Sequence, residues 1–159
     1  MSIKRVTRFN HVCGMQPHMG TDKEYWDQLK LQAKLVLEEA QEMYDACMEE
    51  DLVECADGWA DVKFLNEYMD DLLKAGDVRT DKIFDSVCTN NEGKFTQSYT
   101  YALESKEHLE AKGIPCYIDE SVFEGETYYI VKRNEDGKVQ KLKFHEHPDI
   151  AQFVPVDFR

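Results

Sequence analysis

Residues 21–76 read TDKEYWDQLKLQAKLVLEEAQEMYDACMEEDLVECADGWADVKFLNEYMDDLLKAG, and this stretch decides the fold. Its first half carries apolar residues at alternating spacings of three and four, which predicts one face of an amphipathic helix over roughly 22–49. These residues are Trp26, Leu29, Ala33, Val36, Ala40, Met43 and Cys47. The second half carries a similar series from Leu52 to Leu72 and stops at Gly76, a residue typical of helix ends. Because almost nothing joins the two helices, we expect antiparallel neighbours.

Local signals predict the remaining helices. Thr21 and Asp51 each stand three residues before a glutamate, which is the spacing of a capping box at a helix start. Thr80 predicts the start of a third helix, and a fourth is expected over roughly 97–112. Residues 1–20 are interpreted as an extended arm or as a short helix followed by a loop.

The C-terminal part has a different pattern. Residues 127–133 are rich in strand-forming side chains, residues 134–137 form a turn signal, and residues 138–144 fit a returning strand. We therefore expect a mainly α fold, a four-to-five-helix bundle with a small C-terminal β-hairpin.

One domain is expected over residues 1–159, helical over 20–112 and with a β extension over 113–159. No apolar run reaches the roughly 20 residues that span a bilayer, and no signal core follows the N-terminus, so we expect a cytoplasmic protein without a membrane partner. The net charge of -13 disfavours nucleic-acid binding. Five widely spaced cysteines argue against a disulfide framework.

Carboxylates on the two long helices are the candidate functional groups. Within each helix they are spaced so that several share a face, and the antiparallel arrangement brings both sets to the same end of the pair. They are Glu38, Glu39 and Glu42 on the first helix and Glu54, Asp57 and Asp61 on the second.

Such a cluster is unfavourable without a counter-charge, because neighbouring carboxylates repel one another. Mg²⁺ or Mn²⁺ would relieve the repulsion, since both favour oxygen ligands. Asp57 and Asp61 are the most informative members, because they stand among apolar residues in a helix that we expect to be largely buried. Ordinary solvated surface remains an alternative for the whole set.

Three polar residues are candidates for contacts with phosphate. Asn91 and Lys94 follow the third helix, where an amide donor and a cation could meet phosphate oxygens. Lys34 lies one turn before Glu38 and could reach phosphate, although a surface role is the favoured interpretation.

These motifs resemble a known family. The pattern Glu38-Glu39-x-x-Glu42 followed by Glu54-x-x-Asp57 is similar to the E-x-x-E…E-x-x-D signature of MazG-like all-α NTP pyrophosphatases. Further similarity points to the branch related to phosphoribosyl-ATP pyrophosphohydrolase. It consists of Asp57-Gly58-x-x-Asp61, Val87-x-x-x-Asn91-x-x-Lys94, Asp136-Gly137-Lys138-Val139-x-Lys141 with Pro148-Asp149, and Phe9 with Gly14 and Pro17. Residues 113–135 look like an insertion, as in longer versions carried by bacteriophages.

The resemblance implies a homo-oligomeric, magnesium-dependent enzyme that converts a nucleoside triphosphate to monophosphate and pyrophosphate. Glu39, Glu42, Glu54 and Asp57 would hold Mg²⁺, while Asp61, Asn91 and Lys94 would position the substrate. We hypothesise that water attacks the α-phosphorus and that Glu38 or Glu39 is the general base.

Alternatives remain open at this point. The substrate could be dGTP or GTP, phosphoribosyl-ATP, dUTP or dCTP. From a different class, the chain could be a catalytically silent helical module that binds a basic partner through its acidic face, or a purely structural oligomer.

Overall fold

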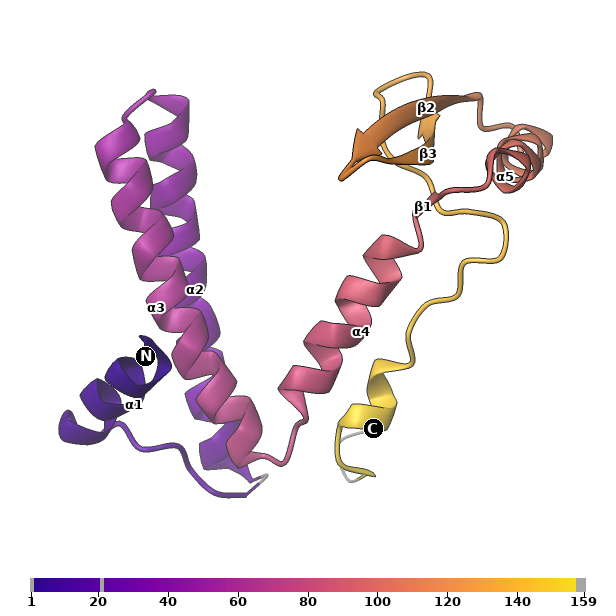
Figure 1. Cartoon of the computed structure of the whole chain (residues 1–159). Coiled ribbons are helices and arrows are strands. Elements are labelled where there is room, and N and C mark those ends of the chain that lie inside the picture. The colour runs from indigo at the N-terminus through magenta and orange to yellow at the C-terminus, as the bar shows by residue number, and fades with distance from the viewer. Residues whose placement is uncertain (1, 21, 157–159) are drawn as a thin grey trace. The chain divides into compact units, whose positions relative to one another are not determined.

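The computed structural model describes residues 2–20 and 22–156 (Figure 1). In that part of the chain, five α-helices and a small three-stranded antiparallel sheet confirm a mainly α protein. Contacts divide the chain into two compact units, Met1–Thr80 with Ala151–Arg159 and Asp81–Ile150. The helix that ends at Ala111 packs on the sheet, so residues on both sides of position 112 belong to the same unit. The single domain and the bundle assignment stay predictions.

The first unit contains the predicted helix pair. Helix α2 (Lys23–Met48) and helix α3 (Leu52–Ala75) run antiparallel side by side, as expected (Figure 1). Asp51 caps α3 by accepting the backbone N–H groups of Val53 and Glu54. Asp22 caps α2, whereas Thr21, the expected cap, lies outside the described residues. Helix α1 (Ser2–Val12) precedes them and leads into a loop.

The α2–α3 interface consists of residues that recur every three or four positions and are all buried or half-buried. From their burial and spacing we assign to it Tyr25, Leu29, Gln32, Val36, Glu39, Met43 and Ala46 of α2, Cys55, Gly58, Val62, Leu65, Met69 and Leu72 of α3, and Gly76, which caps α3. At one position the helices approach unusually closely. A Cβ atom added to Gly58 would lie 2.9 Å from Cβ and 3.0 Å from Cα of Met43.

The predicted apolar face of α2 is therefore correct at four positions, where Leu29, Val36, Ala40 and Met43 are half-buried, and wrong at the other three. Leu29, Val36 and Met43 belong to the interface, but Trp26 is 47% exposed, and Ala33 and Cys47 are also exposed. Polar residues take the intervening positions because they find partners there. They are Gln32, whose amide donates to the Leu65 carbonyl at 2.7 Å, and Tyr25, which packs on Gly76.

Helix α1 completes the core of this unit. Val6 packs with Tyr68 and Leu72, and the rings of Phe9 and Phe64 meet edge to face with centroids 5.5 Å apart. The Tyr68 hydroxyl donates to a loop carbonyl at 2.7 Å, which ties the segment after α1 to α3. Of the two interpretations of residues 1–20, the short helix with a loop is confirmed.

The second unit contains helix α4 (Thr80–Glu92), strand β1 (Phe95–Thr96), helix α5 (Tyr99–Ala111) and strands β2 (Cys116–Phe123) and β3 (Glu126–Arg133). The strand order is β1-β3-β2, and all pairs are antiparallel. Helix α5 packs on the sheet around a core of four buried residues. They are Ala102, Cys116, Val131 and Leu142. A short 3₁₀ helix, η1 (Ile150–Phe153), follows in the chain, and all but its first residue belong to the first unit.

The predicted hairpin is half correct. Residues 127–133 lie in β3, but residues 138–144 form no strand and contribute only an isolated bridge at Val139. The partner of β3 is instead β2, because Glu124 and Gly125 form a tight turn with φ angles of 50° and 83°. Two left-handed residues in succession match the twist of paired strands.

No helix among the described residues has the length and apolar character needed to cross a membrane.

Candidate functional site

The half of the helix pair near the α2–α3 connection carries a high density of negative charge. Between Lys34 and Lys63 the sequence contains ten carboxylates and no lysine, arginine or histidine. They are Glu38, Glu39, Glu42, Asp45, Glu49, Glu50, Asp51, Glu54, Asp57 and Asp61. Since no cation of the same stretch neutralises them, this half of the pair attracts cations from solution.

Glu39 lies at the centre of the predicted carboxylate set. It stands in the α2–α3 interface, one helical turn from Met43, and is half-buried. Burial raises the pKa of the Glu39 carboxyl above its ordinary value, and the negative charges of Glu42, Asp61, Glu38 and Asp57 raise it further. The charges of four other predicted carboxylates, two from each helix, thus act on Glu39.

Glu54, the sixth carboxylate, lies in the first turn of α3. Its backbone N–H donates to the Asp51 side chain at 3.1 Å, and its own side chain is exposed. The metal role expected for Glu54 stays a prediction.

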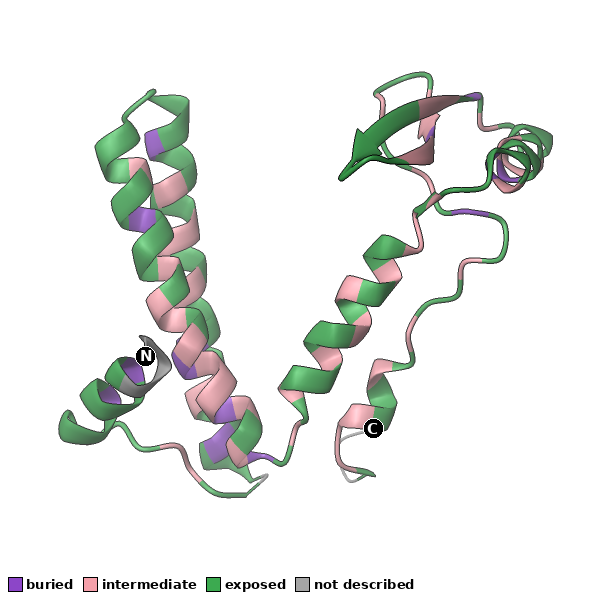
Figure 2. Ribbon diagram, in the orientation of Figure 1, coloured by how far each residue is buried: buried purple, intermediate pink, exposed green. Residues whose placement is uncertain are grey.

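The expectation that Asp57 and Asp61 are embedded in a buried helix is wrong. Both side chains are exposed, as is most of the surface of this half of the helix pair (Figure 2). The apolar residues around them are uncovered as well, and Trp59 is 59% exposed. The phase of the α2–α3 interface explains this, because it turns Gly58 and Val62 toward α2 and leaves the two aspartates at the edge.

The donor chemistry of this set fits a hard divalent cation, since every group is a carboxylate and most are free to turn toward solvent. Within residues 2–20 and 22–156, no three His, Cys, Asp or Glu side chains stand close enough together to hold a metal ion as they are placed. Mg²⁺ or Mn²⁺ at this site would therefore require the carboxylates to converge on the ion.

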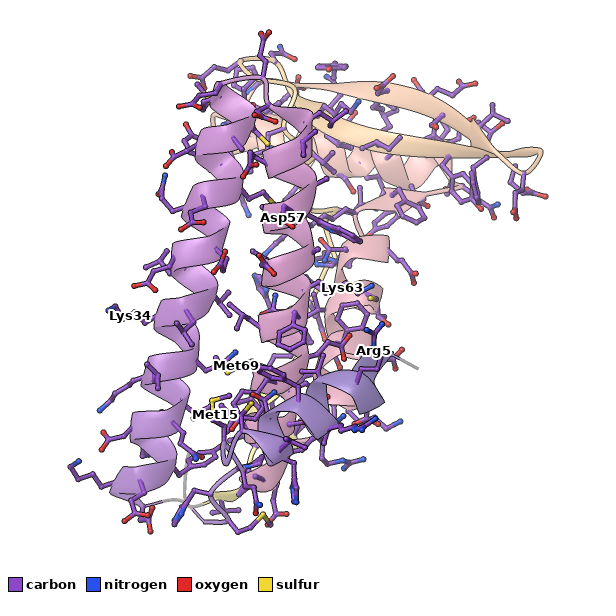
Figure 3. All side chains as sticks on the ribbon, turned by 90° about the vertical axis from the view of Figure 1, so that its left-hand side faces the viewer. Arg5, Met15, Lys34, Asp57, Lys63 and Met69 are labelled. Atoms are coloured by element: carbon purple, nitrogen blue, oxygen red, sulfur yellow. The ribbon has the colours of Figure 1, made fainter. Side chains whose placement is uncertain are left out.

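Lys34 does not face the carboxylates of α3. It points away from that helix (Figure 3), and its ammonium pairs with the Glu38 carboxylate one turn along, at 3.3 Å. Its expected role in binding substrate stays a prediction.

A pocket between α1 and α3 was not predicted. It has a volume of about 500 Å³ and combines aromatic side chains with two cations, Arg5 and Lys63 (Figure 3). Its lining residues are Arg5, Val6, Phe9, Trp59, Ala60, Lys63, Phe64 and Glu67. The Lys63 ammonium lies 5.4 Å from the centre of the Trp59 ring. The sequence signal that could have indicated this pocket is the spacing of four between Trp59 and Lys63, which lie on the helix that carries Asp57.

Asn91 and Lys94 belong to the second unit, where local contacts engage both. The Asn91 amide donates to the Val87 carbonyl at 2.9 Å, and Lys94 donates to the Asn91 side-chain oxygen at 2.7 Å. The V-x-x-x-N-x-x-K pattern therefore describes a self-contained helix end. A role of these residues in binding phosphate stays a prediction.

Gly93 allows the close approach of a histidine side chain. An added Cβ would lie 2.6 Å from Nδ1 of His145, whose Nε2 lies 2.6 Å from the Asn90 side-chain oxygen. These residues border a pocket of about 670 Å³ within the second unit.

No family model, curated protein or solved structure matches this chain. The resemblance to MazG-like enzymes therefore rests on the motifs alone.

Proposed function

We propose that the chain is a magnesium-dependent pyrophosphohydrolase that cleaves a nucleoside triphosphate to the monophosphate and pyrophosphate. The observation that carries the proposal is the half-buried Glu39, on which carboxylates of both helices act electrostatically in a stretch that contains no basic residue. The motif spacing, which resembles MazG-like enzymes, supplies the reaction.

The electrostatics support a cation as the link to the substrate. A triphosphate is repelled by a protein with a net charge of -13 and by ten carboxylates in one stretch. A bound Mg²⁺ would reverse that repulsion, stabilise charge on the phosphate oxygens and lower the pKa of a bound water. Glu39, Glu42, Glu54 and Asp57 are the residues that we expect to hold it.

The two candidates for general base differ in their surroundings. Glu38 is engaged by Lys34, whereas Glu39 is half-buried and has no basic partner in its stretch of sequence. A carboxylate oxygen of Glu39 is therefore the better acceptor for the proton of the attacking water. Asp61, one turn along α3 from Asp57, orients that water or the phosphate.

The pocket between α1 and α3 supports a nucleotide as the substrate. Trp59 offers a face on which a base can stack, and Arg5 and Lys63 offer positive charge for phosphate oxygens. Trp59 and Lys63 belong to the helix that carries Asp57 and Asp61, so one rigid element carries residues for both the base and the triphosphate.

An assay panel tests the proposal. The protein is incubated with Mg²⁺ and each of the common ribo- and deoxyribonucleoside triphosphates, GTP, dGTP, dUTP and dCTP included, and with phosphoribosyl-ATP. We expect monophosphate and pyrophosphate from at least one substrate. Asp57→Asn should abolish turnover, while Asp45→Asn, which removes the same charge from the same helix pair, should retain it. The absence of products from every substrate refutes an enzyme and favours an acidic binding module.

Exposed apolar side chains support the homo-oligomer that belongs to this proposal. Leu37, Tyr44 and Met48 of α2 are all more than half exposed, as is Leu52 of α3. A second copy of the chain is the occupant that we propose for this surface. Sedimentation should show at least a dimer, and Leu37→Glu with Tyr44→Glu should give a folded monomer. A monomeric parent protein contradicts this part of the proposal.

A further inference from the structure

Two cysteines from different helices meet near the connection between α2 and α3. The Sγ atoms of Cys47 and Cys55 lie 3.0 Å apart. Cys47 is exposed and Cys55 is half-buried, so a small reagent can reach the pair. The sulfur–sulfur distance is about 1 Å longer than the roughly 2.05 Å of a disulfide bond.

The close helix approach explains why two short side chains reach each other. Cys47 lies one turn beyond Met43, and Cys55 lies one turn before Gly58. Because Gly58 has no side chain, α3 comes within ordinary contact distance of the Met43 backbone. Cysteines one turn further along are therefore brought close enough to be joined.

We propose that Cys47 and Cys55 are a redox-modification site, which a neutral oxidant of the peroxide class converts to a disulfide across the helix pair. This inference does not depend on the proposed enzymatic activity.

The chemistry balances with hydrogen peroxide as the oxidant. The Cys47 thiolate attacks one peroxide oxygen, the O–O bond breaks, and the departing oxygen leaves as water after taking up a proton. Cys47 is then a sulfenic acid. The Cys55 sulfur attacks the Cys47 sulfur, the S–S bond forms, the S–O bond breaks, and a second water leaves. The two thiols lose two electrons and two protons, and the peroxide gains them.

Exposure and charge set the order of reaction and the choice of oxidant. Cys47 reacts first because it is the more exposed thiol. Cys55 is half-buried and therefore reacts second, once Cys47 has been oxidised. Acidic residues surround the pair in the sequence, and they disfavour anionic disulfides such as oxidised glutathione. These residues are Asp45, Glu49, Glu50, Asp51 and Glu54.

Peptide mass spectrometry tests the proposal. The reduced protein is treated with one equivalent of hydrogen peroxide at low protein concentration, alkylated and digested without reductant. The protease must cleave after glutamate, because no lysine or arginine lies between Lys34 and Lys63 and trypsin would leave both cysteines on one peptide. We expect a peptide pair joined through Cys47 and Cys55, with two hydrogens lost from the chain.

Matched variants decide the outcome. Cys47→Ser and Cys55→Ser should each abolish the linked pair, whereas Cys13→Ser and Cys88→Ser should leave its yield unchanged. Oxidised glutathione at the same concentration should give several-fold less of the disulfide than peroxide. Covalent dimers, linkage through Cys13 or Cys88, or separate over-oxidation of Cys47 with Cys55 still reduced would each overturn the proposal.

Discussion

Replacement of Gly58 by alanine tests the close contact that sets the spacing of α2 and α3. The added Cβ would lie 2.9 Å from Cβ, 3.0 Å from Cα and 3.2 Å from N of Met43. Ordinary carbon contacts are about 3.5–4.0 Å, so α2 has to retreat by roughly 0.5–1 Å. No rotamer change relieves this, because two of the three atoms belong to the backbone.

The expected magnitude follows from two opposing terms. Overpacking lowers the free energy of unfolding by about 1–3 kcal/mol, and the exchange of glycine for alanine within a helix raises it by about 1 kcal/mol. We therefore expect Gly58→Ala to destabilise the protein by about 1 kcal/mol, or a Tm lower by roughly 2–4 °C. Because the retreat also separates Glu39 from Asp57 and Asp61, a higher Mg²⁺ concentration should be needed for half-maximal activity.

Thermal and urea unfolding measure the change in stability, with two controls. Asn66→Ala on the exposed side of α3 should be neutral or slightly stabilising, because it changes helix propensity alone. Met43→Ala should not rescue Gly58→Ala, because the three contacting atoms of Met43 remain. A rise in Tm for Gly58→Ala, by the amount that helix propensity supplies, refutes the close approach.

Three further predictions concern stability and pH. Glu39→Gln should raise the Tm at pH 7 without Mg²⁺. Because the pKa of Glu39 is raised in the folded protein, its contribution to stability is present at pH values below the ordinary value of 4.5 and is lost as the pH rises through the folded-state pKa. An unchanged or lower Tm in Glu39→Gln counts against the carboxylate cluster. His145 should titrate below its ordinary pKa of 6.5, because burial and the charges of Lys141, His147 and Lys94 disfavour its charged form. The free energy of unfolding should therefore fall as the pH drops below 6.5, and it should fall less in His145→Gln. An NMR titration midpoint of His145 at or above 6.5 contradicts this prediction. Leu72→Ala, at a fully buried position, should cost about 2–5 kcal/mol in urea unfolding, and a loss under about 1 kcal/mol contradicts the assigned core.

The sequence predicted those features that depend on neighbouring residues. Asp51 caps α3 and Gly76 ends it because both signals act within one turn of the chain. The antiparallel arrangement followed from the short connection between the two helices.

Features that depend on distant residues were predicted less well. Residues 138–144 were assigned as the partner of β3, but strand pairing depends on turn geometry, and the turn at Glu124 and Gly125 selects β2 instead. The face of α2 was misassigned because an apolar pattern omits Gln32, whose partner is a carbonyl 33 residues away.

The same distinction holds for the candidate site. Spacing along each helix was sufficient to expect six carboxylates, Glu38, Glu39, Glu42, Glu54, Asp57 and Asp61, near the same end of the helix pair. Which of them is half-buried depends on the phase of the α2–α3 interface, and this selects Glu39 in place of the two aspartates. The pocket beside Trp59 involves Arg5 and Phe9 of α1, and no local pattern links them to α3.

The central claim is that carboxylates of α2 and α3 support water attack on the α-phosphorus of a nucleoside triphosphate. The most direct measurement is product analysis in water labelled with heavy oxygen, with Mg²⁺ present. We predict equal amounts of monophosphate and pyrophosphate, with the label only in the monophosphate, and loss of both products in Asp57→Asn. Nucleoside diphosphate with labelled orthophosphate, or full turnover in Asp57→Asn, would contradict the claim.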